Sequence, residues 1–283
     1  MTNHYVKPAL AAAAGLLVAV LAAVPAAAQS SEAESWTGPY VGGRLGYAFQ
    51  HGDEGETVLF DTNLDGSFDN TVTTGTGANA FSPGFCGGAA TTRTPPAGGC
   101  ADDRDGTDWA AHAGFDYQMG RVVVGVVAEY GRTDISDSVS AFSTTPAFYT
   151  LTRELRDTAS LRARAGFASG NTLVYGTGGV AWGKIRNSFS TSNTANVFTN
   201  SGNDDAWGYR VGGGIEQRLG GGFSLGAQYL YTSLKDDDFR VRAGGPAPAG
   251  NPFLRTNASG TDFARSGDRF NSHSAHVTAN FRF

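Results

Sequence analysis

The sequence contains 283 residues, 40 of them glycine, and carries a formal net charge of −5 at pH 7. Glycine is far above its usual share of about 7% and weakens helices, so the composition disfavours a helical protein. The chain has no basic tract that would indicate nucleic-acid binding, and its aromatic content and repeated alternation argue against disorder outside the loops.

The N-terminus has the features of a secretory signal peptide. Lys7 precedes an apolar run from about Ala9 to Val24, and the small residues after it end in Ala28. A basic region, a short apolar region and an A-x-A site describe such a peptide, so we expect residues 1–28 to be removed after Ala28. A membrane anchor helix is the weaker alternative, because the apolar run is short. The mature chain, residues 29–283, holds no second apolar run long enough for a membrane helix.

The two cysteines, Cys86 and Cys100, lie in a stretch rich in glycine, proline and threonine. In an exported protein we expect them to form a disulfide, with two free thiols as the alternative. The bond would close a loop of about 15 residues and contribute ~3 kcal/mol by restricting the unfolded chain.

Eight segments are predicted to be strands, most of them from alternation with a period of two. Each is about as long as a tilted membrane-spanning strand. The predicted strands are Trp36–Phe49, Thr107–Gln118, Val122–Thr133, Glu154–Ser169, Thr172–Asn187, Ala206–Leu219, Phe223–Lys235 and Asn271–Phe283.

The connections between these strands alternate between long and short. Short turns with the glycine that tight hairpins need are expected at Met119-Gly120-Arg121, Gly170-Asn171 and Gly220-Gly221-Gly222. Long polar loops are expected at about Gln50–Gly106, Asp134–Arg153, Ser188–Asp205 and Asp236–Phe270. A barrel inserted in one direction, with short periplasmic turns and long outer loops, follows this rule.

The two faces of the strands differ in polarity, as the last strand illustrates. Phe283, Phe281 and Val277 share one parity, whereas Arg282 and His276 share the other. Aromatic residues also gather near strand ends, as in the girdles at two lipid interfaces; Trp36, Trp109, Trp207 and Phe223 are examples. These features favour a lipid-facing barrel over a lipocalin-like soluble barrel.

The polar parity is expected to face the lumen. The residues assigned to it are Arg44, His112, Asp116, Glu129, Arg162, Arg164, Lys184, Arg210, Glu216, Arg218 and Arg282. Eight strands leave an interior that side chains can fill, and a buried unpaired charge costs several kcal/mol. We therefore expect each acid to be shared by several basic groups in a plugged barrel. The surplus of basic side chains leaves an anion-preferring pore as the alternative.

One stretch of the first long loop resembles the start of a calcium-binding loop. Asp61, Asn63, Asp65 and Asp69 fit the spacing of oxygen ligands, with a glycine at the sixth position. Position twelve is Val72 instead of a bidentate glutamate, so an EF-hand is excluded. The two interpretations are a weak calcium site and a turn whose side chains cap their own backbone.

Nothing in the spacing of residues singles out an enzyme active site. His112 with Glu129 and a loop serine is the only acid–base–nucleophile set that we could assemble. We therefore expect no enzymatic activity and no cofactor other than the calcium just considered.

The opening of the mature chain resembles a known family. Trp36-Thr37-Gly38-Pro39-Tyr40-Val41-Gly42-Gly43 is similar to the first strand of the small outer-membrane β-barrel ("porin family") proteins of alphaproteobacteria, within the OmpA-like eight-stranded barrel superfamily. Gly178–Gly183 and the terminal Phe283 also fit. The resemblance implies an abundant, surface-exposed protein of the outer membrane, in contact with its lipid and lipopolysaccharide. It also implies that Phe281 and Phe283 signal assembly to periplasmic chaperones and the barrel-assembly machinery.

These observations predict an all-β protein, an eight-stranded antiparallel up-and-down transmembrane barrel over residues 29–283. The predicted function is structural, in the outer membrane, with a lumen filled by side chains. The alternatives are a narrow pore with a mild preference for anions, and adhesion or receptor activity through the long loops. Conductance by the folded protein would distinguish the pore from the structural role. Deletion of the long loops would abolish only the adhesion or receptor activity.

Overall fold

The structure is a computed structural model that describes residues 35–50, 55–248 and 250–283. The predicted signal peptide, residues 1–28, lies outside the described residues. Within them the only helical element is the three-residue 3-10 helix η1 (Pro252–Leu254). No helix in this described part is long and apolar enough to cross a membrane.

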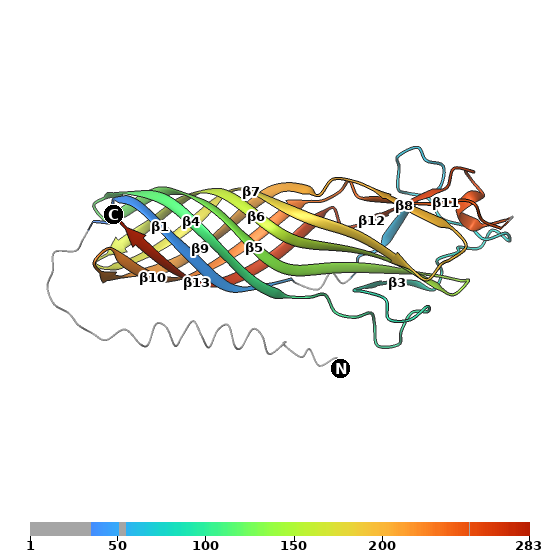
Figure 1. Ribbon diagram of the computed structural model, residues 1–283, viewed down its shortest axis with the longest axis horizontal. Helices are drawn as coiled ribbons and strands as arrows, with labels where there is room; N and C mark the ends of the chain where they lie inside the picture. Colours follow the sequence, from blue (N-terminus) through green and yellow to red (C-terminus); the bar gives the residue numbers. More distant parts are fainter. Residues whose placement is uncertain (1–34, 51–54, 249) are drawn as a thin grey trace.

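Eight long antiparallel strands pair into a closed ring (Figure 1). Their order around the ring is β5-β4-β1-β13-β10-β9-β7-β6, and pairing of β6 with β5 closes it. All eight predicted strands lie on this ring, and Phe223–Lys235 has the predicted bounds. The ring strands are β1 (Gly38–Phe49), β4 (Gly106–Met119), β5 (Val122–Ser143), β6 (Ala147–Ser169), β7 (Thr172–Thr191), β9 (Asp205–Gly220), β10 (Phe223–Lys235) and β13 (Arg269–Arg282).

The three predicted short turns lie between β4 and β5, β6 and β7, and β9 and β10. Gly120 and Gly170 have φ of +62° and +58°. This is the left-handed region that a side chain disfavours and glycine adopts readily. The turns therefore connect neighbouring strands in register at one end of the ring.

The prediction of a long loop at Asp134–Arg153 is wrong. β5 continues to Ser143 and β6 begins at Ala147, so most of this stretch is strand. Burial no longer alternates here: residues 137–143 are all buried, and Ile135, Val139 and Leu151 are 0% exposed. Val139 and Leu151 pack under the loops, and Ile135 packs inside the ring. The local sequence does not reveal either partner.

The other long connections also contain strands. β2 (Val58–Asp61), β12 (Thr261–Arg265), β11 (Arg240–Gly244) and β8 (Val197–Ser201) form a second antiparallel sheet in that order, and β3 (Gly84–Gly87) extends the edge of β5. We call the second sheet and η1 the cap. It lies at the long-connection end of the ring (Figure 1). Its apolar core includes Phe60, Phe81, Tyr149, Phe253 and Phe263.

The outer face of the ring is apolar, as the parity predicted. Leu161, Phe167, Trp207 and Phe223 are 57%, 70%, 65% and 58% exposed, respectively. On β5 this apolar face ends at Tyr130; beyond it the outward side chains include the exposed Arg132. The apolar surface is thus a belt around the ring that stops before the cap.

Candidate functional site: the filled interior of the ring

The carboxylate of Glu129, on β5, occupies the middle of the interior. Arg44 of β1 donates from Nε to Oε2 at 2.8 Å and from Nη2 to Oε1 at 3.0 Å. Arg162 of β6 reaches Oε2 at 3.0 Å and Arg210 of β9 reaches Oε1 at 2.7 Å. One acid is thus shared by three guanidinium groups from three other strands, and all four side chains are buried.

Asp108 and His276 complete this group, and the predicted lumen set omitted both. Asp108 Oδ2 lies 3.0 Å from Arg44 Nη1 and 3.1 Å from His276 Nε2, and the His276 ring also contacts the Arg44 guanidinium. Both residues share parity with assigned lumen residues, Asp108 with His112 and His276 with Arg282. Strict use of parity could therefore have found them. His112 itself pairs with Asn280 at 2.6 Å.

A second buried charge group lies closer to the short turns. Arg164 contacts Glu216 Oε2 at 2.5 Å and Asp116 Oδ2 at 3.5 Å. Arg282 donates to the same Asp116 oxygen at 2.7 Å. The Arg164 guanidinium also stacks 3.9 Å from the centre of the Tyr175 ring, an arrangement in which the cation is attracted to the face of the ring.

Glycines in the strands provide the space for these large interior groups. A Cβ at Gly114 would overlap the ring of Tyr40, and a Cβ at Gly125 would overlap the Asp116 carboxylate. The high glycine content therefore reflects close packing of arginine and tyrosine side chains inside a narrow ring.

Trp36 closes the short-turn end from the inside, which corrects its assignment to an aromatic girdle. Its side chain is 1% exposed, and the guanidinium groups of Arg218 and Arg282 lie 4.5 and 5.5 Å from its ring centre. Arg282 also donates to the Trp36 carbonyl at 2.7 Å. Trp36 precedes β1, so the facing of strand residues does not apply to it, and the cations draw it inward.

Lys184 is the one assigned lumen residue that the structure places outside the ring, and that prediction is wrong. On β7, Leu173, Tyr175 and Ile185 are buried, so odd-numbered positions face inward. Lys184 is exposed and pairs in register with Asp205 of β9. The glycines of β7 carry no side chain that would reveal this parity in the sequence.

An apolar layer crosses the interior on the cap side of the Glu129 group. It lies beyond Glu129 on β5, where Ile135 follows, and beyond Arg210 on β9, where Ala206 precedes it. The layer consists of Ala48, Ile135, Leu155, Ala181, Ile185, Ala206, Leu234 and Phe270. Such a layer offers no partner to a hydrated ion, which would have to lose its water to cross it.

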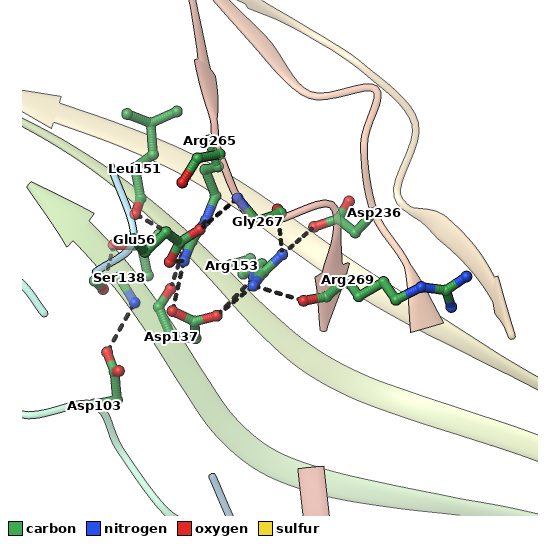
Figure 2. Close-up of polar contacts among 12 residues, drawn as sticks. Glu56, Asp103, Asp137, Ser138, Leu151, Arg153, Asp236, Arg265, Gly267 and Arg269 are labelled. Atoms are coloured by element: carbon green, nitrogen blue, oxygen red, sulfur yellow. Dashed lines mark hydrogen bonds and ion pairs between the residues drawn. The ribbon is translucent and has the colours of Figure 1, made fainter. Parts of the chain in front are cut away.

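A third charge group joins the ring to the cap (Figure 2). Arg153 of β6 donates to Asp137 of β5 at 2.7 Å, and Arg265 of β12 donates to the other oxygen of Asp137 at 2.6 Å. Arg265 also pairs with Glu56, and Arg153 Nη1 lies 3.9 Å from Asp236 Oδ2. We call these five residues the cap latch. The sequence did not predict the latch, because its members lie in segments that were expected to be loops.

The latch lies beyond the apolar belt, so its ionisable groups are outside the membrane-spanning part of the ring. Burial raises the pKa of Asp137, but the Arg153 and Arg265 guanidiniums outweigh burial and hold it below its usual value. The pKa of Asp236 is raised, mainly by burial. Asp137 therefore carries the negative charge to which both arginines bind.

A small cavity lies among the charge groups. Its volume is about 20 Å³, and it is lined by His112, Arg162, Arg164, Tyr175 and Gln228 among others. A single water needs roughly 10–15 Å³ by the same measure. The charge groups, the apolar layer and the cap thus lie in series along the interior.

The predicted disulfide is present, joining Cys86 and Cys100 with their Cα atoms 6.0 Å apart. It ties β3, at the edge of β5, to the remainder of the first long connection. The bond therefore restrains the longest connection against a ring strand.

The aspartate-rich stretch forms a compact turn. Asp61 Oδ1 accepts from the Leu64 amide at 2.6 Å and Oδ2 accepts from the Gly66 amide at 2.8 Å. Asp65 accepts from the amide of Ser67 and the side chain of Asn63, each at 2.8 Å, whereas Asp69 accepts from its neighbour Asn70. Within residues 35–50, 55–248 and 250–283, no three His, Cys, Asp or Glu side chains are placed to hold a metal ion together. The geometry is that of side chains capping their own backbone.

The C-terminal aromatics lie on the outer face. Phe283 is 72% exposed, and the Phe281 ring lies 4.8 Å from that of Phe223 on β10 and 5.1 Å from that of Phe283. They are thus accessible at the short-turn end of the ring.

The chain is similar to known outer-membrane proteins. The family model described as "Outer membrane protein beta-barrel domain" matches residues 14–283. The chain is 28% identical over 205 residues to the 31 kDa outer-membrane immunogenic protein of Brucella melitensis, covering 71% of this chain and 72% of that protein. It is 28% identical over 131 residues to the 22 kDa outer membrane protein of Rhizobium leguminosarum, covering 46% and 54% of the two chains. Among solved structures it is similar to the outer membrane protein OprG of Pseudomonas aeruginosa, with 14% identity, a TM-score of 0.44, and coverage of 87% and 97%.

Proposed function

Since this chain belongs to the outer membrane protein β-barrel family and is an all-β, antiparallel protein of the outer membrane, we propose that it is a structural, non-enzymatic surface protein with a closed lumen. Its eight ring strands span the membrane as an up-and-down barrel. The short turns lie in the periplasm and the cap lies outside the cell. The apolar belt contacts lipid, and the cap side contacts lipopolysaccharide.

The observation that carries this proposal is the series of three barriers inside the ring. An ion entering from the cap meets the latch, then the apolar layer, then guanidiniums already paired with Glu129, Asp116 and Glu216. Removing one partner of a buried ion pair costs about 3–5 kcal/mol, so the paired arrangement is strongly favoured. Because the three barriers lie in series, displacement of one side chain does not open a path.

A narrow pore that prefers anions is the second candidate, and the charge excess inside the ring favours it. Six buried arginines face four buried acids there. The arginines are Arg44, Arg162, Arg164, Arg210, Arg218 and Arg282, and the acids are Asp108, Asp116, Glu129 and Glu216. This function requires the apolar layer to open, whereas the structural role does not.

The proposal also covers the assembly of the protein and its need for cofactors. Phe281 and Phe283 present the recognition signal for periplasmic chaperones and the barrel-assembly machinery, supported by their exposure at the end of the chain. The protein uses no cofactor. The Asp61 turn acts as a self-capped turn and not as a calcium site, supported by the backbone amides that already occupy both Asp61 oxygens.

Solute flux through proteoliposomes tests the proposal. Folded protein, verified by different gel mobility with and without boiling, is inserted into vesicles loaded with an impermeant polymer, and swelling is followed in neutral sugars and in chloride salts. A known general porin refolded in the same way is the positive control. We expect swelling no faster than in empty vesicles, and chloride-dependent swelling would favour the pore instead.

A further inference from the structure

The cap contains a second, much larger cavity that the structural role does not use. Its volume is about 450 Å³, which lies within the range of roughly 300–1,000 Å³ typical of ligand pockets. All four long connections contribute to its wall: Thr74 from the first, Thr145 from the β5–β6 turn, Asn193 from the third and Asn251 from the fourth. Segments far apart in sequence thus converge on one pocket, which we call the cap pocket.

The lining of the cap pocket carries no charged side chain among the residues that the structure describes. The Arg255 guanidinium lies beside Gly75, at one edge of the lining. Away from that edge a buried phosphate, sulfate or carboxylate would lack a counter-charge, and burying an unpaired charge is costly. Most of the pocket therefore disfavours ionic ligands. It differs in this respect from the interior of the ring, which is filled with guanidiniums.

The pocket combines apolar and hydroxyl-bearing surfaces. Phe81, Tyr149 and Phe253 pack together behind its wall and are only 2%, 2% and 4% exposed. The apolar surface open to the pocket therefore comes mainly from Pro146, Ala195 and Pro252. Thr144 and Thr145 are exposed beside them. Hydroxyls both donate and accept hydrogen bonds, so the wall suits a ligand with one apolar face and many hydroxyl groups.

The amide side chains of the pocket are already held in place. Asn193 Nδ2 donates to Tyr149 Oη at 2.9 Å and to Asn196 Oδ1 at 3.1 Å. Asn251 and Asn196 exchange hydrogen bonds of 3.0 and 3.2 Å through their amides. A site whose polar groups are fixed before binding loses less conformational entropy when the ligand arrives.

From these observations we propose that the cap pocket binds a neutral carbohydrate. The sugar's C–H face contacts the apolar surface of Pro146, Ala195 and Pro252, and its hydroxyls bond to the threonine hydroxyls and the asparagine amides. A purely apolar ligand would leave the exposed Thr144 and Thr145 hydroxyls without partners. The location of the pocket outside the cell rests on the proposed function, whereas the binding site itself does not.

The test uses the full mature protein, refolded in detergent micelles and verified by gel mobility. It is titrated with neutral disaccharides (lactose, maltose, cellobiose and N,N′-diacetylchitobiose) and with sulfated lactose and a glucuronic-acid disaccharide as charged counterparts. Binding is followed by saturation-transfer NMR and calorimetry. We expect at least one neutral sugar to bind, and the charged counterparts to bind at least about tenfold more weakly, equivalent to 1.4 kcal/mol.

Two tryptophan variants locate the binding. Ala195 is exposed and lines the pocket, so Ala195→Trp should fill it and weaken binding at least about tenfold. Val197 is 51% exposed on β8 and lies outside the lining, so Val197→Trp is the matched control and should leave affinity unchanged. Thr145→Ala, in an exposed turn, should weaken binding about fivefold through one lost hydrogen bond.

The proposal is overturned if no neutral sugar binds to folded protein, if the charged sugars bind equally well, or if Ala195→Trp has no effect. Binding of short peptides in place of sugars would also overturn it. Because binding is measured in micelles and flux in vesicles, a conducting protein that binds sugar would refute the closed lumen and leave the cap pocket standing.

Discussion

Removal of the charge on Glu129 should strongly destabilise the barrel. The carboxylate accepts four hydrogen bonds, at 2.7 to 3.0 Å, from Arg44, Arg162 and Arg210. In Glu129→Gln one carboxylate oxygen is replaced by an amide NH2 group, which can only donate, and it then faces guanidiniums that also only donate. Counting Asp108 as well, three arginines face two acids before the change and one acid after it.

Removing one partner of a buried pair costs about 3–5 kcal/mol, and we expect a loss in this range from the free energy of unfolding. A second change, Arg162→Met, removes one guanidinium and restores the original excess of one positive charge. Because neighbouring sites couple by roughly 0.5–3 kcal/mol, the double variant should regain at least about 1 kcal/mol of this loss.

The assay is urea unfolding of each variant in lipid vesicles, followed by tryptophan fluorescence and by gel mobility. Glu154→Gln is the control, because Glu154 is paired with arginines at the surface and such pairs contribute only about 0–1 kcal/mol. A Glu129→Gln loss no larger than the control, or a double variant no more stable than the single, would refute this account of the interior.

Three further outcomes are expected. Because the pKa of Asp137 is lowered in the folded protein, its pairing with Arg153 and Arg265 contributes stability above the unfolded value of about 3.9 and loses it as pH falls through the folded value. Protease cleavage of the cap should therefore rise in acid, and Asp137→Asn should be cleaved at pH 7 already. Replacing Cys86 and Cys100 with serine should remove up to ~3 kcal/mol from the local stability of the first connection, seen as faster hydrogen exchange there with unchanged flux. Phe283→Ser should lower the amount assembled in the outer membrane of cells yet shift unfolding of purified protein by less than about 0.5 kcal/mol, since the side chain is 72% exposed; equal losses in both assays would contradict an assembly role.

The ring strands could be predicted because each carries its own signal. Alternation of Phe281 and Arg282, or of Leu161 and Arg162, places one side chain in lipid and the next in the interior, with 57% exposure for Leu161 and 2% for Arg162. The lipid environment makes this contrast strong on almost every strand. Parity then assigns lumen residues wherever the side chains are large enough to display it.

The remaining features depend on contacts between distant segments. The glycines of β7 hid the parity that places Lys184 outside the ring, and Trp36 faces inward because of the arginines near the other end of the chain. The latch and the cap pocket join residues of connections separated by more than 100 positions, such as Arg265 and Asp137. Local patterns of polarity carry no information on which loop covers another.

The most direct test of the closed lumen is planar-bilayer recording of the folded protein, with insertion verified by protease protection of the barrel strands. We predict a baseline without discrete current steps at any applied voltage that the bilayer tolerates. Stable, repeated steps with selectivity for anions would contradict a lumen closed by paired charges, the apolar layer and the cap, and would make the protein a pore.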